Sequence, residues 1–195
     1  LVTPITFGEL SGNDVTVDMF ANISKWDVEH IALAKLADLF VVAPATADII
    51  GKVANGIADD MLSTTIMATK AKVLFVPSMN TNMYENPIVQ ANMEKLRSFG
   101  YEFVEPESGH LACNTSGKGR FPALETIMDC AEKCIYGREL LKGKKVVVSA
   151  GGTQEKIDPV RYISNRSSGR QGYAIAKAAW MEGADVTLVS CTTAL

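Results

Sequence analysis

The chain has 195 residues, of which 47% are hydrophobic and 21% charged, and its formal net charge of -3 is typical of a soluble globular protein. The small negative charge gives no electrostatic basis for binding nucleic acid. No apolar run approaches the roughly 18 residues of a membrane span, and the N-terminus does not resemble a signal peptide. We therefore expect a cytoplasmic protein whose partners include neither nucleic acid nor a membrane.

The predicted elements alternate between helix and strand. Ser24 and Asp27 have the spacing of a capping box and predict a helix over "SKWDVEHIALAKLA". Short runs rich in β-branched residues predict buried parallel strands at Leu39 to Ala43, Val73 to Val76 and Val146 to Ser149. A further helix, from about Pro87 to Ser98, precedes Gly100 and the strand "YEFVE". This order predicts an α/β doubly wound parallel sheet of the flavodoxin-like or Rossmann-like type.

A charged, glycine-containing stretch at 136–145 interrupts this pattern and predicts a domain boundary. The residues after it read as a strand, a long loop, a helix from about Gly169 and a second strand, which is one βαβ unit. Two strands are too few to fold alone, and nothing precedes the first domain's opening residues, so we expect both ends to be truncated. The predicted domains are 1–137 and, as the start of a second Rossmann-like domain, 138–195.

Four cysteines occur without the spacing of a disulfide framework, and a cytoplasmic location would keep them reduced. Cys130 and Cys134 lie four residues apart on a predicted helix and are interpreted as packing residues, because the two histidines do not supply the further ligands of a metal site. We predict no metal site among these side chains and a free thiol at Cys113.

Two loops follow predicted strands at the sheet edge where α/β proteins bind ligands. We expect Pro44 to end the first strand, Thr46 to offer a hydroxyl, and the next helix to present unpaired N–H groups to a phosphate or a flavin edge. An ordinary turn with an N-cap is the alternative. In the loop "VPSMNTNMYENP" an asparagine amide can bind a carboxylate, although turn chemistry also explains its composition.

The remaining candidate residues are a histidine and a cysteine. His30 would share a helix face with Trp26 and Ala34, which fits a core histidine or, beside a ligand, a base near neutral pH. Cys113 lies in "GHLACNTSGKGR", predicted to be a flexible loop in which glycines 109, 117 and 119 act as hinges. The alternative is an incidental loop cysteine.

Taken together, these segments resemble one family. "HIALAKLADLFVVAPATADIIGKVANGIADDML", "PSMNTNMY" and "GHLACNTSGKGR" resemble the histidine, flavin-binding, asparagine-containing and clamp motifs of phosphopantothenoylcysteine decarboxylases. "VVVSAGGTQEKIDPVRYISNRSSGRQG" resembles the start of phosphopantothenate-cysteine ligases. In this order they are similar to the bifunctional flavoproteins of coenzyme A biosynthesis, over nearly the whole chain.

The resemblance implies a mechanism and roles for named residues. In the family, FMN oxidises the cysteinyl thiol of 4'-phosphopantothenoylcysteine, CO2 is lost, and the enethiol is reduced to 4'-phosphopantetheine. His30 would be the base, Asn80 would hold the substrate carboxylate, and Cys113 would donate a proton. The implied cofactor and substrate contacts are Pro44, Ala45 and Thr46 for FMN, and Met83, Gly109, Ala112, Gly117 and Arg120 for the substrate.

The ligase resemblance implies activation of phosphopantothenate by CTP, with Mg2+, to an acyl-cytidylate that cysteine attacks. Small residues at a helix N-terminus allow close approach to phosphates. The residues concerned are Gly151, Gly152, Arg161, Asn165, Ser167, Ser168 and Gly169. Without the resemblance, "GGT" and "SSG" are equally explained as turns.

The chain departs from the family pattern at three positions. Asp48 and Ile49 stand where the flavin motif has Asn and Thr, and a carboxylate there is unfavourable beside an anionic cofactor unless it points away. Tyr84 replaces a common Trp. The family's glycine-rich phosphate loop and most of the ligase domain are absent, so we expect these residues alone to bind flavin poorly and not to ligate.

Three further expectations rest on the family. A homo-oligomer, trimeric or dodecameric, is implied by analogy, with FMN sites at subunit contacts. A catalytically inactive flavin-binding regulatory or scaffold relative is one alternative function. A decarboxylase of peptides ending in cysteine is the other.

Overall fold

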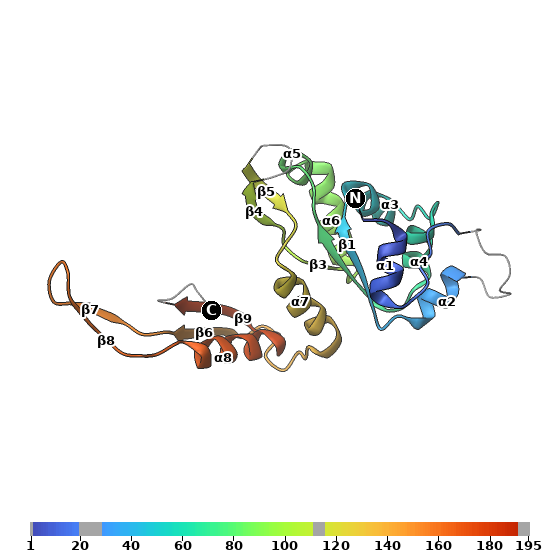
Figure 1. The fold of residues 1–195 in the computed structure, drawn as a ribbon. Helices are drawn as coiled ribbons and strands as arrows, with labels where there is room; N and C mark the ends of the chain where they lie inside the picture. The colour runs from blue at the N-terminus through green and yellow to red at the C-terminus, as the bar shows by residue number, and fades with distance from the viewer. Residues whose placement is uncertain (1, 20–28, 111–115, 191–195) are drawn as a thin grey trace. The chain divides into compact units, whose positions relative to one another are not determined.

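The computed structural model describes residues 2–19, 29–110 and 116–190, and the chain divides into two compact units, 1–135 and 136–195 (Figure 1). The elements of the first unit are α1 (Pro4–Ser11), α2 (Glu29–Leu36), β1 (Leu39–Ala45), α3 (Ala47–Ala54), α4 (Met61–Ala68), β2 (Lys72–Pro77), α5 (Thr81–Tyr84), α6 (Pro87–Ser98), β3 (Glu102–Phe103), β4 (Glu107–His110), β5 (Ser116–Arg120) and α7 (Leu124–Tyr136). Those of the second are β6 (Lys145–Ala150), β7 (Gln154–Lys156), β8 (Tyr162–Ser164), α8 (Arg170–Met181) and β9 (Asp185–Ser190).

A parallel sheet of order β1-β2-β3 forms the centre of the first unit. β2 is its middle strand, and Phe75 on it is fully buried, with its ring centroid 5.2 Å from that of Phe103. The predicted strands at 39–43 and 73–76 are confirmed. So is the helix from Pro87 to Ser98, where Asn86 caps the N-terminus by accepting from the backbone N–H of Ile88 and Pro87 takes the first helical position.

Pro44 does not end the first strand, contrary to the prediction. β1 continues to Ala45, which pairs with Pro77 beyond an irregularity after Val42. Among the described strands β1 lies at the edge of the sheet, and there a residue without an N–H breaks no ladder hydrogen bond. Of the helix predicted over 24–37, the described part begins at Glu29; Ser24 and Asp27 lie outside the described residues.

Within the predicted flexible loop at 109–120, residues 109–110 and 116–120 instead belong to two antiparallel strands, β4 and β5, which are called the β4–β5 hairpin below. β4 pairs with β5 so that Gly109 lies opposite Gly117 and His110 opposite Ser116. Backbone hydrogen bonds between strands need no particular side chain, which is why a segment poor in apolar residues still forms them. The glycine content alone therefore predicted a flexible loop where the described residues form paired strands.

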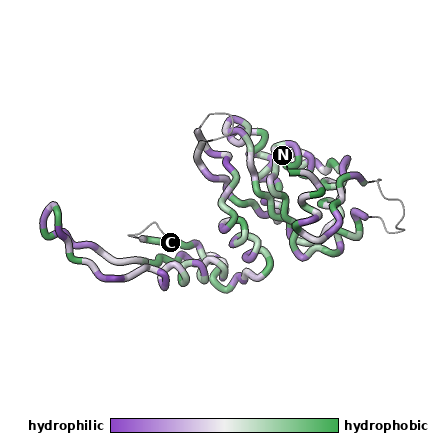
Figure 2. Tube along the Cα trace, viewed as in Figure 1, coloured by the Kyte–Doolittle hydropathy of each residue, from purple (hydrophilic) through white to green (hydrophobic). Residues whose placement is uncertain are grey.

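In the second unit, β6 and β9 are parallel neighbours and α8 packs on both strands. The strand predicted at 146–149 and the helix beginning near Gly169 are confirmed. The stretch between them, predicted as a loop, contains the two-stranded ribbon β7–β8, whose end carries apolar residues, with Val160 87% exposed (Figure 2). No helix in the described ranges is long and apolar enough to cross a membrane.

Candidate functional site

An open pocket of about 530 Å³ lies at the carboxyl end of β1. Pro44 and Thr46 line it, together with Phe40, Leu33 and Ile49, while Ala45 is buried behind it. Thr46 is the N-cap residue of α3, yet its side chain makes no capping hydrogen bond. The first N–H groups of α3 and this hydroxyl are thus available for a ligand, which keeps the flavin-edge interpretation in place over a simple capped turn.

The positive charge of Lys52 offsets the negative charge of Asp48, the carboxylate that stands where the family's flavin motif has Asn. Its ammonium lies 3.7 Å from Asp48, 2.9 Å from Asp59 and 2.8 Å from Asp60. Hydrogen bonds to Asp60 and then Asp59 raise the pKa of Lys52 above its ordinary range. Because one ammonium faces three carboxylates, the pocket wall suits an uncharged planar ring better than a phosphate.

Asp60 holds the start of α4 in place beside this pocket. Its carboxylate accepts from the backbone N–H of Ser63 at 2.7 Å, and the Ser63 hydroxyl accepts in turn from the backbone N–H of Asp60. The Asp60→Ala variant is expected to lose about 1 kcal/mol of unfolding free energy, the usual cost of removing such a cap. Urea unfolding measures this. Asp59→Ala is the matched control, because Asp59 contacts the same ammonium but precedes the cap, and an equal loss there would contradict the capping role.

The Asp60 carboxylate also makes the free energy of unfolding depend on pH. The hydrogen bond from Lys52, followed by that from the Ser63 backbone, lowers the pKa of Asp60 to about 2. This folded-state pKa lies below the unfolded value of about 3.9, so the stabilisation is present above pH about 4 and is lost as the pH falls toward 2. Asp60→Asn, which keeps a capping oxygen, should flatten that part of the stability profile.

His30 lies in the first turn of α2 and is half-buried, so it is not a fully enclosed core histidine. Its neighbour Glu29 accepts from the Thr16 hydroxyl at 2.6 Å, and Ala34, one turn along the helix, is buried. Trp26 lies outside the described residues. α2, which carries His30, packs on α4, at the end of the first unit opposite α5 (Figure 1).

Asn80 is the N-cap residue of α5, directly after β2. Its side-chain oxygen accepts from the backbone N–H of Asn82 at 2.9 Å, so the turn chemistry considered from the sequence is present and fixes the carboxamide's orientation. Met83 on the same short helix is 47% exposed, whereas Tyr84 is buried. Asn80 and Met83 therefore share one rigid turn at the carboxyl end of the central strand.

The β4–β5 hairpin docks on this turn through its glycines. The backbone N–H of Met79 donates to the Gly119 carbonyl at 3.0 Å. A β carbon on Gly119 would lie 2.3 Å from the Met79 carbonyl oxygen, and one on Gly117 would lie 2.5 Å from the Thr81 hydroxyl. Gly119 thus permits close approach of the Met79 backbone and Gly117 permits close approach of the Thr81 side chain; the hinge role expected from the sequence stays a prediction.

Other predicted contacts lie on the same hairpin. The Arg120 side chain extends beside Gly109, where a β carbon would lie 3.3 Å from it. Arg120 itself is exposed at the end of β5. Ala112 and Cys113 lie in the connection between the strands, outside the described residues.

Sequence reasoning missed a cluster beside this hairpin. Glu105 accepts from the Tyr84 hydroxyl at 3.2 Å, from Arg97 at 3.0 Å and from Lys118 at 2.8 Å. The only available signal was the presence of charged residues in β5 and α6, which a solvated surface explains equally well.

A second open pocket, of about 510 Å³, lies between the end of β6 and the start of α8. Four of the predicted ligase contacts line this pocket: Gly151, Ser167, Ser168 and Gly169. Arg166 and Arg170, which sequence reasoning did not select, also line it. Both arginines flank the "SSG" motif, a signal that was present in the sequence.

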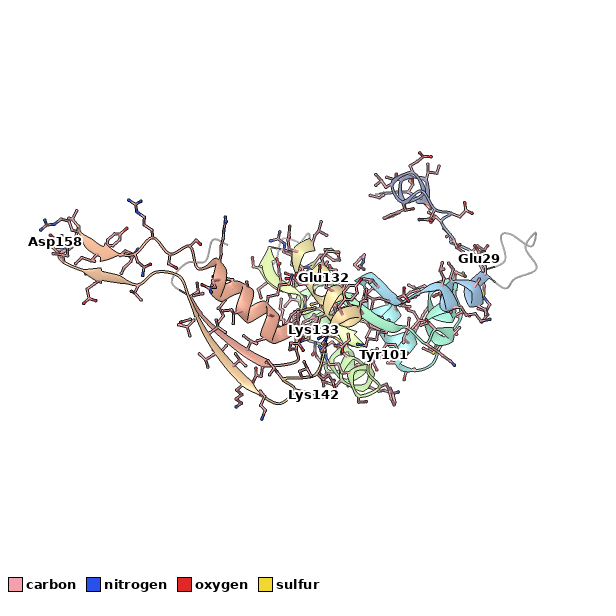
Figure 3. The ribbon with its side chains drawn as sticks, turned by 90° about the horizontal axis from the view of Figure 1, so that it is seen from below. Glu29, Tyr101, Glu132, Lys133, Lys142 and Asp158 are labelled. Carbon is pink, nitrogen blue, oxygen red and sulfur yellow. The ribbon has the colours of Figure 1, made fainter. Side chains whose placement is uncertain are left out.

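Asn165 and Arg161 have different places relative to this pocket. A β carbon on Gly152 would lie 2.6 Å from the Asn165 side-chain oxygen, so Gly152 permits close packing there. Arg161 instead lies toward the far end of the β7–β8 ribbon, 2.6 Å from Asp158 (Figure 3). The structure therefore groups six of the seven predicted ligase residues around the end of β6 and leaves Arg161 on the ribbon.

The cysteines of α7 have the packing role predicted for them. Cys130 and Cys134 are half-buried and pack on the cluster of Leu74, Val76, Val104 and Ile127. Burial raises the pKa of both thiols. Within the described ranges, no group of three or more His, Cys, Asp and Glu side chains could hold a metal ion.

Comparison with known proteins extends these observations. A family model described as Flavoprotein matches residues 1–136, and one described as DNA/pantothenate metabolism flavoprotein C-terminal domain matches residues 141–195. The coenzyme A biosynthesis bifunctional protein CoaBC of Bacillus subtilis is 49% identical over 97% of this chain and 47% of its own length; that of Mycobacterium tuberculosis is 46% identical over 97% and 46%. The chain spans about half the length of these relatives.

Solved structures resemble part of the chain. A PPC decarboxylase variant complexed with pantothenoylaminoethenethiol is 28% identical, with a TM-score of 0.57, over 61% of this chain and 69% of that one. The FMN-dependent cysteine decarboxylase SpaF is 32% identical, with a TM-score of 0.55, over 65% and 70%. The FMN binding protein AtHal3 is 29% identical, with a TM-score of 0.55, over 61% and 68%. These likenesses confirm the predicted α/β class with a parallel sheet. The Flavoprotein family model matches residues 1–136, which is most of this chain, so the chain belongs to the flavoprotein family.

Proposed function

We propose that this chain performs the FMN-dependent decarboxylation of 4'-phosphopantothenoylcysteine to 4'-phosphopantetheine in coenzyme A biosynthesis, joined to a CTP-dependent ligase. Residues 1–137 are the decarboxylase part and 138–195 the beginning of the ligase part. The names of the curated relatives, and the PPC decarboxylase among the solved structures, support this choice. The protein acts in the cytoplasm on small-molecule substrates.

The observation that carries the proposal is the docking of the β4–β5 hairpin on the turn that contains Asn80. The Met79–Gly119 hydrogen bond joins the residue before Asn80 to the strand that follows Cys113 in the sequence. Asn80 holds the substrate carboxylate, and Met83 contacts the substrate beside it. The hairpin, with Gly109, Ala112, Gly117 and Arg120, covers the substrate and brings the Cys113 thiol to it.

FMN, when bound, would take up the two electrons of thiol oxidation and return them to the enethiol. The proton that completes this reduction comes from the Cys113 thiol. A solved PPC decarboxylase in which a cysteine is replaced by serine is complexed with pantothenoylaminoethenethiol, an enethiol. That complex supports a cysteine proton donor, because an enethiol is what remains when the donor is lost.

Pro44, Ala45 and Thr46 fit one edge of the flavin ring. Their pocket is lined by apolar side chains and by the start of α3, where the Thr46 side chain makes no capping hydrogen bond. Asp48 does not prevent this, since its side chain is 74% exposed and lies beside the Lys52 ammonium. The flavin phosphate would need a binding site other than this pocket wall.

His30 reaches the substrate from a neighbouring subunit of a homo-oligomer, trimeric or dodecameric. The separation of α2 from α5 within one chain supports this arrangement. Two inactive variants, His30→Asn and Asn80→Ala, are expected to recover activity when they are co-expressed, because mixed oligomers contain sites with both intact residues. CO2 release by the mixed protein measures this. No recovery, in oligomers shown by mass to be mixed, contradicts the shared site.

The second pocket holds the ligase nucleotide. Gly151, Gly152, Asn165, Ser167, Ser168 and Gly169 bind CTP and the acyl-cytidylate, with Mg2+ on the phosphates and Arg161 on the acyl-cytidylate charge. The close approach at Gly152 and the left-handed backbone of Gly169, with a φ of 79°, support a glycine-dependent cradle at the start of α8.

The test of the decarboxylase proposal uses the full-length purified protein. We expect oxidised-flavin absorption bands and CO2 release from 4'-phosphopantothenoylcysteine. Release from a peptide ending in cysteine, but not from this substrate, would identify a peptidyl-cysteine decarboxylase. Flavin bands without CO2 from either substrate would identify a regulatory or scaffold relative, and absence of flavin would contradict all three.

A further inference from the structure

Glu105 occupies the short link between β3 and β4 and joins three separate elements. Its carboxylate accepts from the Tyr84 hydroxyl at the end of α5, from Arg97 on α6 and from Lys118 on β5. All three bonds lie between 2.8 and 3.2 Å. One carboxylate therefore connects the helix that begins after Asn80 with the hairpin that contains Cys113.

Two further contacts make this connection specific. The Lys118 ammonium lies 5.4 Å from the centroid of the Tyr84 ring, a cation–π distance, so it meets both partners of the Tyr84–Glu105 bond. Tyr84 is 5% exposed and belongs to the main core cluster. The hairpin is thus fixed to a side chain that cannot itself move without disturbing the core.

The cluster contributes more to geometry than to stability. The Glu105 side chain is 60% exposed and that of Lys118 43% exposed, and exposed ion pairs add little to unfolding free energy. Burial on its own would raise the pKa of Glu105, but the hydrogen bond and charge of Lys118 outweigh it and lower the pKa. The carboxylate is therefore ionised at neutral pH and available to all three donors.

We propose that Glu105 is a positioning residue for the decarboxylase reaction: its carboxylate, through Lys118 and Tyr84, holds against the turn of Asn80 the two strands, β4 and β5, between which Cys113 lies in the sequence. This inference rests on the proposed function. It assigns Glu105 no contact with substrate or flavin. Its effect is on the proton transfer that completes enethiol reduction, since the proposed proton donor, Cys113, follows β4 and precedes β5 in the sequence.

The experiment compares Glu105→Gln with Glu94→Gln in the full-length protein. Glu94 is the matched control, because it also accepts from Arg97 but lies on the same helix as Arg97 and spans no second element. For Glu105→Gln we expect a fall in kcat of about tenfold with little change in KM, and a larger fraction of turnover released as enethiol. Glu94→Gln should match the wild type in all three quantities.

A second measurement reports on the hairpin without any activity. Hydrogen exchange of the Met79 amide, which donates to Gly119, should accelerate in Glu105→Gln and not in Glu94→Gln. Lys118→Met should accelerate it as well, while Lys118→Arg, which keeps the charge, should restore slow exchange. These variants remove exposed groups, so they should remain folded.

The possible results separate the positioning role of Glu105 from the proposed decarboxylase function. A wild-type enethiol fraction in Glu105→Gln, or a reduced kcat with unchanged Met79 exchange, overturns the positioning role. If the wild-type protein releases no CO2, the proposed function fails instead. The exchange comparison then still decides whether Glu105 holds the hairpin in place.

Discussion

Gly119→Ala is expected to lower formation of 4'-phosphopantetheine about a hundredfold, the cost typical of misplacing a reacting group by roughly 1 Å. The added β carbon would lie 2.3 Å from the Met79 carbonyl oxygen, inside contact distance with backbone that cannot rotate away. The φ of Gly119 is 137°, a conformation that residues with a β carbon rarely adopt. The hairpin must therefore move off the turn of Asn80, and the Cys113 thiol moves with it. Formation of 4'-phosphopantetheine under single-turnover conditions measures the effect.

Gly100→Ala separates the two causes. Gly100 also has a positive φ, of 89°, but no atom lies within 4 Å of the position of its β carbon. This control should cost about 1 kcal/mol of unfolding free energy through backbone strain and leave turnover per folded molecule unchanged. Equal turnover in the two variants would show that hairpin docking at Gly119 is not needed for the reaction.

Cys113→Ser is expected to decrease formation of 4'-phosphopantetheine by a factor of about 10² to 10⁴, the usual contribution of a positioned acid. A serine hydroxyl is a far weaker acid than a thiol, so it cannot supply the proton that completes enethiol reduction. CO2 loss precedes that step and should continue, so the enethiol should accumulate. Mass spectrometry of the products, with CO2 measured in parallel, gives the ratio.

The control for this prediction is Cys130→Ser. Cys130 is half-buried on α7 and packs on the core, so its replacement should reduce stability slightly without changing the ratio of enethiol to product. Unchanged product formation in Cys113→Ser would remove Cys113 from the mechanism. A raised enethiol fraction in Cys130→Ser would show that the ratio reports on stability instead of proton donation.

Predictions from the sequence succeeded where local pattern and burial agree. The strands around Val42 and Phe75 are short and contain β-branched residues, β2 is buried from Val73 to Pro77, and the helix from Pro87 carries its own Asn86 cap. Such elements are specified by residues a few positions apart, so the periodicity along the chain contains the necessary information. The motif that includes Asn80 was placed correctly for the same reason, since it follows a buried strand directly.

The sequence by itself determined the α/β class, the main strands and helices, and the family to which the chain belongs. Tertiary structure alone decided that Pro44 stays within β1, that Gly119 admits the Met79 backbone and Gly117 the Thr81 side chain, and that Glu105 accepts from donors on α5, α6 and β5. Each of these depends on atoms brought together from segments distant along the chain. Local propensity carries no record of such neighbours, because a glycine that bends freely and one that must admit a carbonyl oxygen look identical in sequence.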